Sequence, residues 1–280
     1  MSQDSAGMHD STRSRTPPRP VDNTDWLKTV AIICVSAGHF GFFFMDDEQW
    51  WSVLGRFAAP PFFFLVGYSQ NRTVPFHWIW IGVILTLLES SNADWTWVAP
   101  NILLSLALIR LARPYVQMLM QRHGWAAFVL LVSTFLVVLP IAAKIVDYGA
   151  EGWLWALFGL CQRQYVDGIE AVSSVGEAQR SATGPAGLMR LLACLVAAVV
   201  FAWQEHKEFS FPPIHLAVVI LGLGVLSVSL CLFKRGESRI QPSEKIASTL
   251  RFIGQYTLEI YAIQLAGSEL IVMLVPGLSP

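Results

Sequence analysis

Nine apolar stretches, most of them close to the length needed to cross a bilayer, follow one another along this chain of 280 residues. A hydrocarbon core of about 30 Å requires roughly 20 helical residues. Lipid offers the backbone polar groups no partner, so each stretch is expected to be a helix. The stretches are 26–45, 50–70, 76–91, 96–112, 125–143, 152–162, 188–204, 213–233 and 249–275.

The composition agrees with a membrane environment. Hydrophobic residues make up 54% of the chain and charged residues only 14%, against about 25% charged in soluble domains. We therefore predict an all-α, polytopic bundle of about nine spans (eight to ten) over 25–280. The predicted bundle lies in the lipid bilayer and does not bind nucleic acid. The sixth stretch is short, so it is either a half-span or continues past Cys161, and Pro60-Pro61 should kink the second. The four cysteines form no Cys/His cluster, so no metal site is predicted.

The basic residues indicate the orientation. If the polar segment 1–24 is a disordered cytoplasmic tail, 16 of the 19 Lys and Arg residues fall on or beside the cytoplasmic side. The opposite assignment would break the positive-inside rule. The sequence thus predicts a cytoplasmic N-terminus.

Ionisable and amide side chains within the spans mark a candidate site, because such groups are costly in lipid. His39 lies six residues before Met45, Arg56 six residues after Trp50 and Asn101 six residues after Trp95. These three reference residues mark the outer ends of three predicted spans, so the polar side chains share one depth. Glu259 and Tyr261 in the last span fall near the same level. Lys28 lies eleven residues before His39, on nearly the same helix face and roughly 16 Å away along the axis.

Packing offers another interpretation of each residue. His39 or Asn101 can hydrogen-bond a neighbouring helix, and Arg56 with Glu259 can form a structural ion pair. Glu89 and Glu269 lie near span ends, where snorkelling explains them.

Several motifs resemble those of membrane acyltransferases (the acyltransferase family 3 superfamily). The first-helix signature of that superfamily resembles Asp-Trp-Leu-Lys at 25–28, followed by ten residues and His39. The second-helix signature resembles Arg56 followed by Phe-Phe-Phe-Leu-Val-Gly-Tyr at 62–68. Pro60-Pro61 and the stretch 101–108 resemble the shorter TraX family of conjugative pilin acetylases. Residues 254–261 resemble the last-helix motif, with Gln264 where a histidine is usual.

The resemblance implies a multi-pass protein of the bacterial inner membrane that moves an acetyl or other acyl group from acyl-CoA to an acceptor. The expected acceptor is the N-terminal amine of a conjugative pilin. His39 and Arg56 would be catalytic, with Asn101, Glu259 and Tyr261 as a supporting polar layer. Lys28 and Arg72 would bind the CoA phosphates, and no metal would be needed.

Two other functions compete with this one. Intramembrane His, Arg and Glu residues also form the proton relays of transporters and exporters. A structural component of a conjugation or secretion apparatus would use the same polar layer only for packing. Binding of acyl-CoA is expected only of the enzyme.

Overall fold

The computed structural model describes residues 19–45, 49–71, 73–92, 99–173 and 184–275. Within these ranges the chain forms eleven helices, and the isolated bridge Asp22–Glu237 is the one β-type pairing. The all-α prediction is confirmed. The helices are α1 (Asn23–Phe44), α2 (Gln49–Gly55), α3 (Ala59–Tyr68), α4 (Phe76–Asn92), α5 (Ile102–His123), α6 (Trp125–Ile145), α7 (Gly149–Ser173), α9 (Pro185–Phe209), α10 (Pro213–Cys231), α11 (Glu244–Gln255) and α12 (Thr257–Leu274).

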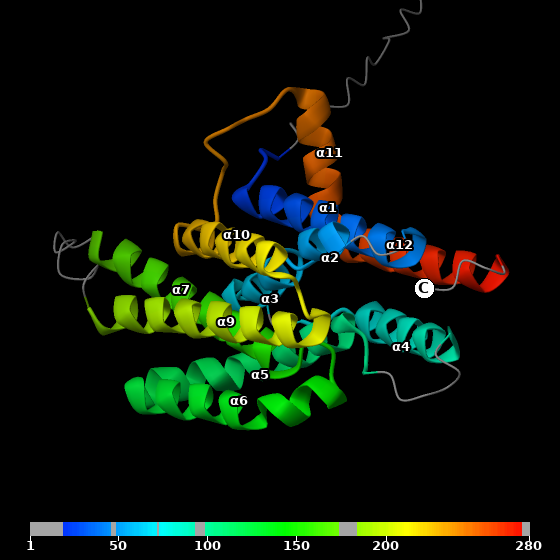
Figure 1. The fold of residues 1–280 in the computed structure, drawn as a ribbon. Helices are drawn as coiled ribbons and strands as arrows, with labels where there is room; N and C mark the ends of the chain where they lie inside the picture. Colours follow the sequence, from blue (N-terminus) through cyan, green and yellow to red (C-terminus); the bar gives the residue numbers. More distant parts are fainter. Residues whose placement is uncertain (1–18, 46–48, 72, 93–98, 174–183, 276–280) are drawn as a thin grey trace, which may run out of the picture.

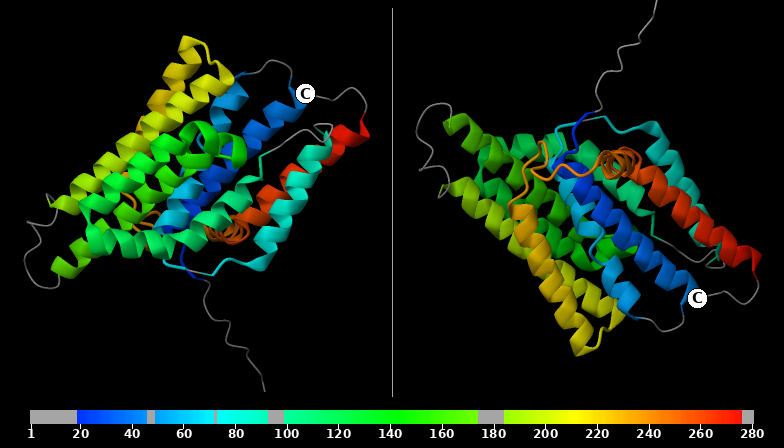
Figure 2. Two further views of the ribbon diagram at one scale, coloured as in Figure 1. Left: turned by 90° about the horizontal axis from the view of Figure 1, so that it is seen from below. Right: turned by 90° about the horizontal axis from the view of Figure 1, so that it is seen from above.

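Six helices of the described part are long and apolar enough to cross a membrane: α1, α5, α6 as far as Ala142, α9, α10 and α12. Helix α4 is apolar but shorter. Most of the helices run side by side along one direction, whereas α11 lies crosswise at one end of α1 (Figures 1 and 2). The count of about nine spans and the cytoplasmic N-terminus stay predictions.

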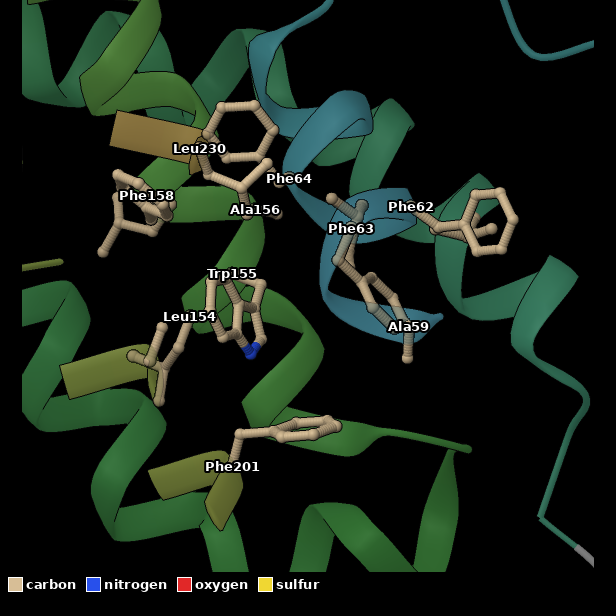
Figure 3. Packing of buried hydrophobic residues seen from close by; sticks show 14 of the residues in the cluster. Ala59, Phe62, Phe63, Phe64, Leu154, Trp155, Ala156, Phe158, Phe201 and Leu230 are labelled. Carbon is tan, nitrogen blue, oxygen red and sulfur yellow. The ribbon is translucent and has the colours of Figure 1, made fainter. Parts of the chain in front are cut away.

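The core forms where α3 packs against α7. Phe64, Trp155 and Phe158 are fully buried there, and Figure 3 shows their rings gathered between the two helices. Glycines permit this close approach, because a Cβ at Gly67 would collide with the backbone of Ala156 on α7. Close backbone contact holds α3 in place, and α3 carries one wall of the site described below.

The second predicted span is divided into α2 and α3. The break lies at 56–58, and Pro60 and Pro61 occupy the first turn of α3. Proline fits there because its missing N–H would have no intrahelical acceptor. The expected kink is therefore present as a break just before the proline pair, and it places Arg56 at the interruption.

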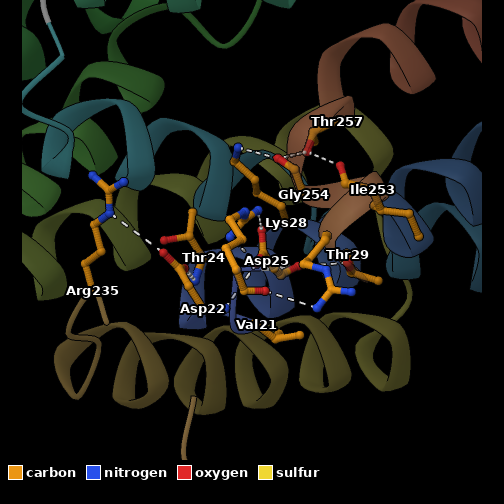
Figure 4. Close-up of polar contacts among 12 residues, drawn as sticks. Val21, Asp22, Thr24, Asp25, Lys28, Thr29, Arg235, Ile253, Gly254 and Thr257 are labelled. Carbon is orange, nitrogen blue, oxygen red and sulfur yellow. Dashed lines mark hydrogen bonds and ion pairs between the residues drawn. The ribbon is translucent and has the colours of Figure 1, made fainter. Parts of the chain in front are cut away.

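Two predicted stretches differ from the structure. The sixth continues past Cys161, the longer of its two alternatives, in α7, a helix of 25 residues. The ninth is not one helix: it is broken at Tyr256 between α11 and α12. Lys28 Nζ donates to the Gly254 carbonyl at 2.7 Å and Thr257 Oγ1 donates to the Ile253 carbonyl at 2.6 Å. These side chains satisfy carbonyls at the end of α11, so the chain can turn there (Figure 4).

Residues 1–18 of the predicted tail 1–24 lie outside the described residues. From Arg19 onward it packs on the bundle: Arg19 forms two hydrogen bonds of 2.9 Å with Asp25, and Val21 is fully buried. Asp22 caps α1 through Thr24 N. We call this end of the bundle, where α1 begins, the basic face, and the end where α1 terminates the acidic face.

Candidate functional site: two cavities joined by an apolar wall

A cavity of about 570 Å³ lies toward the acidic face, and we call it the acidic cavity. Residues of α1, α3, α5 and α12 line it, together with the turns at Arg56 and at Asp147. Four carboxyl side chains face it, which are those of Glu89, Asp147, Glu208 and Glu269. Apolar side chains fill most of the remaining wall, as is usual in pockets that bind small molecules.

His39 lies in the wall of the acidic cavity, five residues before the end of α1 at Phe44. Its ring centroid is 5.7 Å from that of Tyr261 and 6.3 Å from that of Phe43. The Nδ1 atom is shielded from solvent and has no hydrogen-bond partner within the described part of the chain. Since a buried polar atom without a partner is costly, this nitrogen is suited to a group that a substrate would bring.

Arg56 lines the same cavity but pairs with Glu205 of α9, through an Nη1–Oε2 contact of 3.0 Å. Its Nε donates to the Ser52 carbonyl at 3.2 Å, and its guanidinium lies 4.2 Å from the centroid of the Phe209 ring. The alternative pairing with Glu259 is wrong, because Glu259 lines a different cavity and contacts His77 there. These contacts fix the plane of the guanidinium, whose Nη2 makes no hydrogen bond among the described residues.

Asn101 is the N-cap of α5, not a mid-span residue, because α5 begins at Ile102. Its Oδ1 accepts from Leu103 N at 3.2 Å. Its Nδ2 donates to Glu89 at 3.0 Å and to the Tyr261 hydroxyl at 3.3 Å. Asn101 thus connects α5 to α4 and α12 by hydrogen bonds, as expected of a packing residue. It also lines the same cavity as His39.

The turn between α6 and α7 contributes Asp147 and Tyr148. Burial, followed by the charges of Glu89 and Glu208, raises the pKa of Asp147 to about 7. Tyr148 has a φ of +54°, a conformation that is rare for a bulky side chain and is often found at functional sites. The turn therefore presents a carboxyl group that can gain or lose a proton near neutral pH.

A second cavity, of about 420 Å³, lies toward the basic face, and we call it the basic cavity. Four cations line it: Lys28, Arg110, Arg163 and Arg235. Arg163 pairs with Asp167 at 2.8 Å, and Arg235 is 3.8 Å from Asp22. The predicted cation Lys28 is thus in a cavity suited to anions, whereas Arg72 lies outside the described residues.

Glu259 also belongs to the basic cavity, where its carboxylate is 3.4 Å from His77 Nε2. It lies in the first turn of α12, which starts at Thr257, and so lines a different cavity from His39. Two residues later, Tyr261 does face the acidic cavity.

Phe62, Leu106 and Leu258 line both cavities. They come from α3, α5 and α12, and we call them the apolar wall. On α5, Ile102 faces the acidic cavity, Leu106 faces both and Arg110 faces the basic cavity, so the wall is about one helical turn thick. The cavities therefore approach each other from opposite faces of the bundle.

The structure brings together His39, Arg56, Asn101 and Tyr261, and separates Lys28 and Glu259 from them into the basic cavity. Sequence reasoning missed the carboxyl groups. Glu89 and Glu269 face the acidic cavity instead of snorkelling, and Asp147 and Glu208, which were not among the predicted site residues, line it too. Their signal was the excess of acidic residues at one set of span ends.

Fold and site together define a helical membrane protein with a cavity lined by cations and a cavity lined by carboxyl groups, which meet at an apolar wall. A family model described as "TraX protein" matches residues 23–223, more than half of the chain. The chain belongs to the TraX family. No curated protein and no solved structure matches it.

Proposed function

We propose that this protein is a membrane acetyltransferase that moves the acetyl group of acetyl-CoA to the N-terminal amine of a conjugative pilin in the bacterial inner membrane. One observation carries the proposal: a cavity lined by cations and a cavity lined by carboxyl groups meet across a thin apolar wall beside His39. Membership of the TraX family, which is associated with pilin acetylation, supports it.

The basic cavity suits the phosphates of CoA. Lys28, Arg110 and Arg163 come from three different helices and converge on one space, where each can contact phosphate oxygens. The side chains of Trp78 and Tyr68 add ring faces there. The phosphates would stay on the basic face while the uncharged thioester arm extends toward His39.

The acidic cavity suits a protonated amine, because carboxyl groups attract the cation and lower-dielectric walls strengthen that attraction. After the ammonium group loses its first proton to a cavity carboxylate, the amine lone pair attacks the thioester carbonyl carbon. His39 accepts the second proton as the new C–N bond forms. The C–S bond then breaks, and the CoA thiolate takes that proton from His39 and leaves as the thiol.

Two groups can stabilise the oxyanion that forms on the carbonyl oxygen. Arg56 is oriented by Glu205 and Ser52, and Asn101 Nδ2 is held at the same cavity. Donors that are fixed before the reaction contribute most to such stabilisation. Tyr261, beside both Asn101 and His39, keeps the imidazole in position.

Transfer of label from radioactive acetyl-CoA tests the proposal in membranes that contain the protein, with and without a co-expressed pilin. We expect label on the pilin band, and a mass increase of one acetyl group at the pilin N-terminus. Absence of label on every acceptor, with the protein folded and in the membrane, contradicts it.

The buried carboxyl groups favour a second candidate, a proton-coupled transporter. Glu89, Asp147 and Glu269 lie around one cavity with His39, an arrangement that proton relays also use. Binding of acetyl-CoA to the purified protein separates the two, since only the enzyme requires it. Binding that is lost on Lys28→Ala and Arg110→Ala favours the enzyme, and absence of binding favours the transporter.

A further inference from the structure

We propose that Phe62, Leu106 and Leu258 form a selective passage between the two cavities, which admits a slender, uncharged acyl-thioester arm and excludes ions and branched acyl groups. This inference rests on the proposed function for its substrate. It adds the residues that determine which acyl groups reach His39. The same residues would keep the two cavities from becoming one water-filled channel.

The order of residues along three helices supports the passage. On α3, Ala59 faces the acidic cavity, Phe62 faces both and Leu65 faces the basic cavity. Helix α5 repeats this order through Leu106, as described above. On α12, Leu258 faces both cavities, Glu259 the basic one and Tyr261 the acidic one.

Each of the three helices therefore contributes one residue that borders both cavities: Phe62 on α3, Leu106 on α5 and Leu258 on α12. Leu106 is 2% exposed and Phe62 8% exposed, Leu258 is half-buried, and the two cavities are separate in this structure. Every atom that travels from the cations of the basic cavity to His39 by way of the two cavities has to move past these side chains. A change of side-chain rotamer in Phe62 or Leu258 would open the gap without moving a helix.

The chemistry of the wall explains what would pass. A constriction lined only by apolar side chains excludes water and ions, because they lose hydration there without gaining a partner. The phosphates of CoA cannot follow the thioester for the same reason, and the cations on the basic face hold them. The pantetheine arm and a linear acetyl group are thin, whereas a branched acyl group adds width just where the passage is narrow.

Widening the wall should therefore relax acyl selectivity. The variants are Leu258→Ala, which removes a half-buried side chain, and Phe62→Leu, which keeps the site apolar. Leu108→Ala is the matched control, because Leu108 is 48% exposed on α5 and lines neither cavity. The assay compares transfer of the acyl group from acetyl-CoA and from 2-methylpropanoyl-CoA to the same pilin.

We expect the ratio of branched to acetyl transfer to rise about tenfold in Leu258→Ala and in Phe62→Leu, because one or two methylene groups in an apolar pocket change selectivity by that order. The control should keep the wild-type ratio. An unchanged ratio in both wall variants, with acetyl transfer retained, overturns the passage.

A second measurement does not depend on acyl transfer. Proteoliposomes containing wild type, Leu258→Ala or Leu108→Ala are loaded with a pH-sensitive dye and given a proton gradient. The passage predicts that wild type and Leu108→Ala stay tight and that Leu258→Ala leaks. Equal leak rates in all three overturn it. Failure of wild type to transfer either acyl group would instead refute the proposed function, and the leak rates would still decide on the wall.

Discussion

Arg56 and Glu205 form an ion pair whose removal should show how much the broken span α2–α3 depends on electrostatics. The Nη1–Oε2 distance is 3.0 Å, and the Glu205 side chain is only 3% exposed while that of Arg56 is 19% exposed. Two unit charges about 4 Å apart interact by roughly 4 kcal/mol at an effective dielectric constant near 20. Desolvation offsets much of that attraction, so the pair itself adds little, but either charge left alone is costly.

We therefore expect Arg56→Met to lower the free energy of unfolding by about 3–5 kcal/mol, because it leaves the Glu205 carboxyl group buried without a partner. Arg56→Met combined with Glu205→Leu should recover most of that loss. Unfolding in mixed detergent micelles, followed by tryptophan fluorescence, gives the three values. Arg122→Met, at the exposed end of α5, is the control and should stay within about 0.5 kcal/mol of wild type.

The double variant decides the question. A coupling energy between the two sites of about 2 kcal/mol or more supports a direct interaction. If the two substitutions are additive, or if Arg56→Met alone costs less than about 1 kcal/mol, the pair does not hold the break in place and the reasoning is wrong.

Three further outcomes are expected. Lys28→Ala should raise the KM for acetyl-CoA several-fold, with a smaller effect on kcat. Lys245→Ala, which lies outside the basic cavity, should change neither constant, and steady-state kinetics measure both. Gly67→Ala should prevent folding, because the added Cβ would collide with the backbone of α7. Gly224→Ala, whose Cβ would enter open space, should fold, and size-exclusion profiles compare the two variants. Asp147 has a folded pKa raised to about 7, so the stability tied to its protonated form is present below about pH 4 and is lost as the pH rises through 7. Asp147→Asn should therefore lose less thermal stability than wild type between about pH 5 and pH 8, and an equal loss in both would contradict that assignment.

The hydropathy pattern was enough to predict the helices, because apolar length is a property of each segment alone. The ends of the helices were harder to predict, because they depend on contacts of individual side chains. The break at Tyr256 depends on Lys28 and Thr257 satisfying carbonyls at the end of α11, and Lys28 is far away in sequence. The start of α5 at Ile102 depends on the cap provided by Asn101. Local pattern does not contain such contacts.

The candidate site could be predicted only where its residues stand out within single apolar segments. His39, Arg56, Asn101 and Tyr261 were found because polar residues stand out in apolar segments, and all four line the acidic cavity. Glu89, Asp147, Glu208 and Glu269 lie at helix ends, where charged residues are common and carry little signal. Their convergence on one cavity follows only from how the helices pack.

In the proposed mechanism acetyl transfer depends on His39, and substitution of this residue tests that role. Transfer from labelled acetyl-CoA to pilin is measured in membranes with wild type, His39→Gln and the control His215→Gln. His215 packs against Trp50, with 4.1 Å between ring centroids and the rings tilted by 39°, and lines neither cavity. We predict wild-type label with His215→Gln and a loss of about a hundredfold or more with His39→Gln at equal protein levels. Label of similar intensity with His39→Gln would contradict the account.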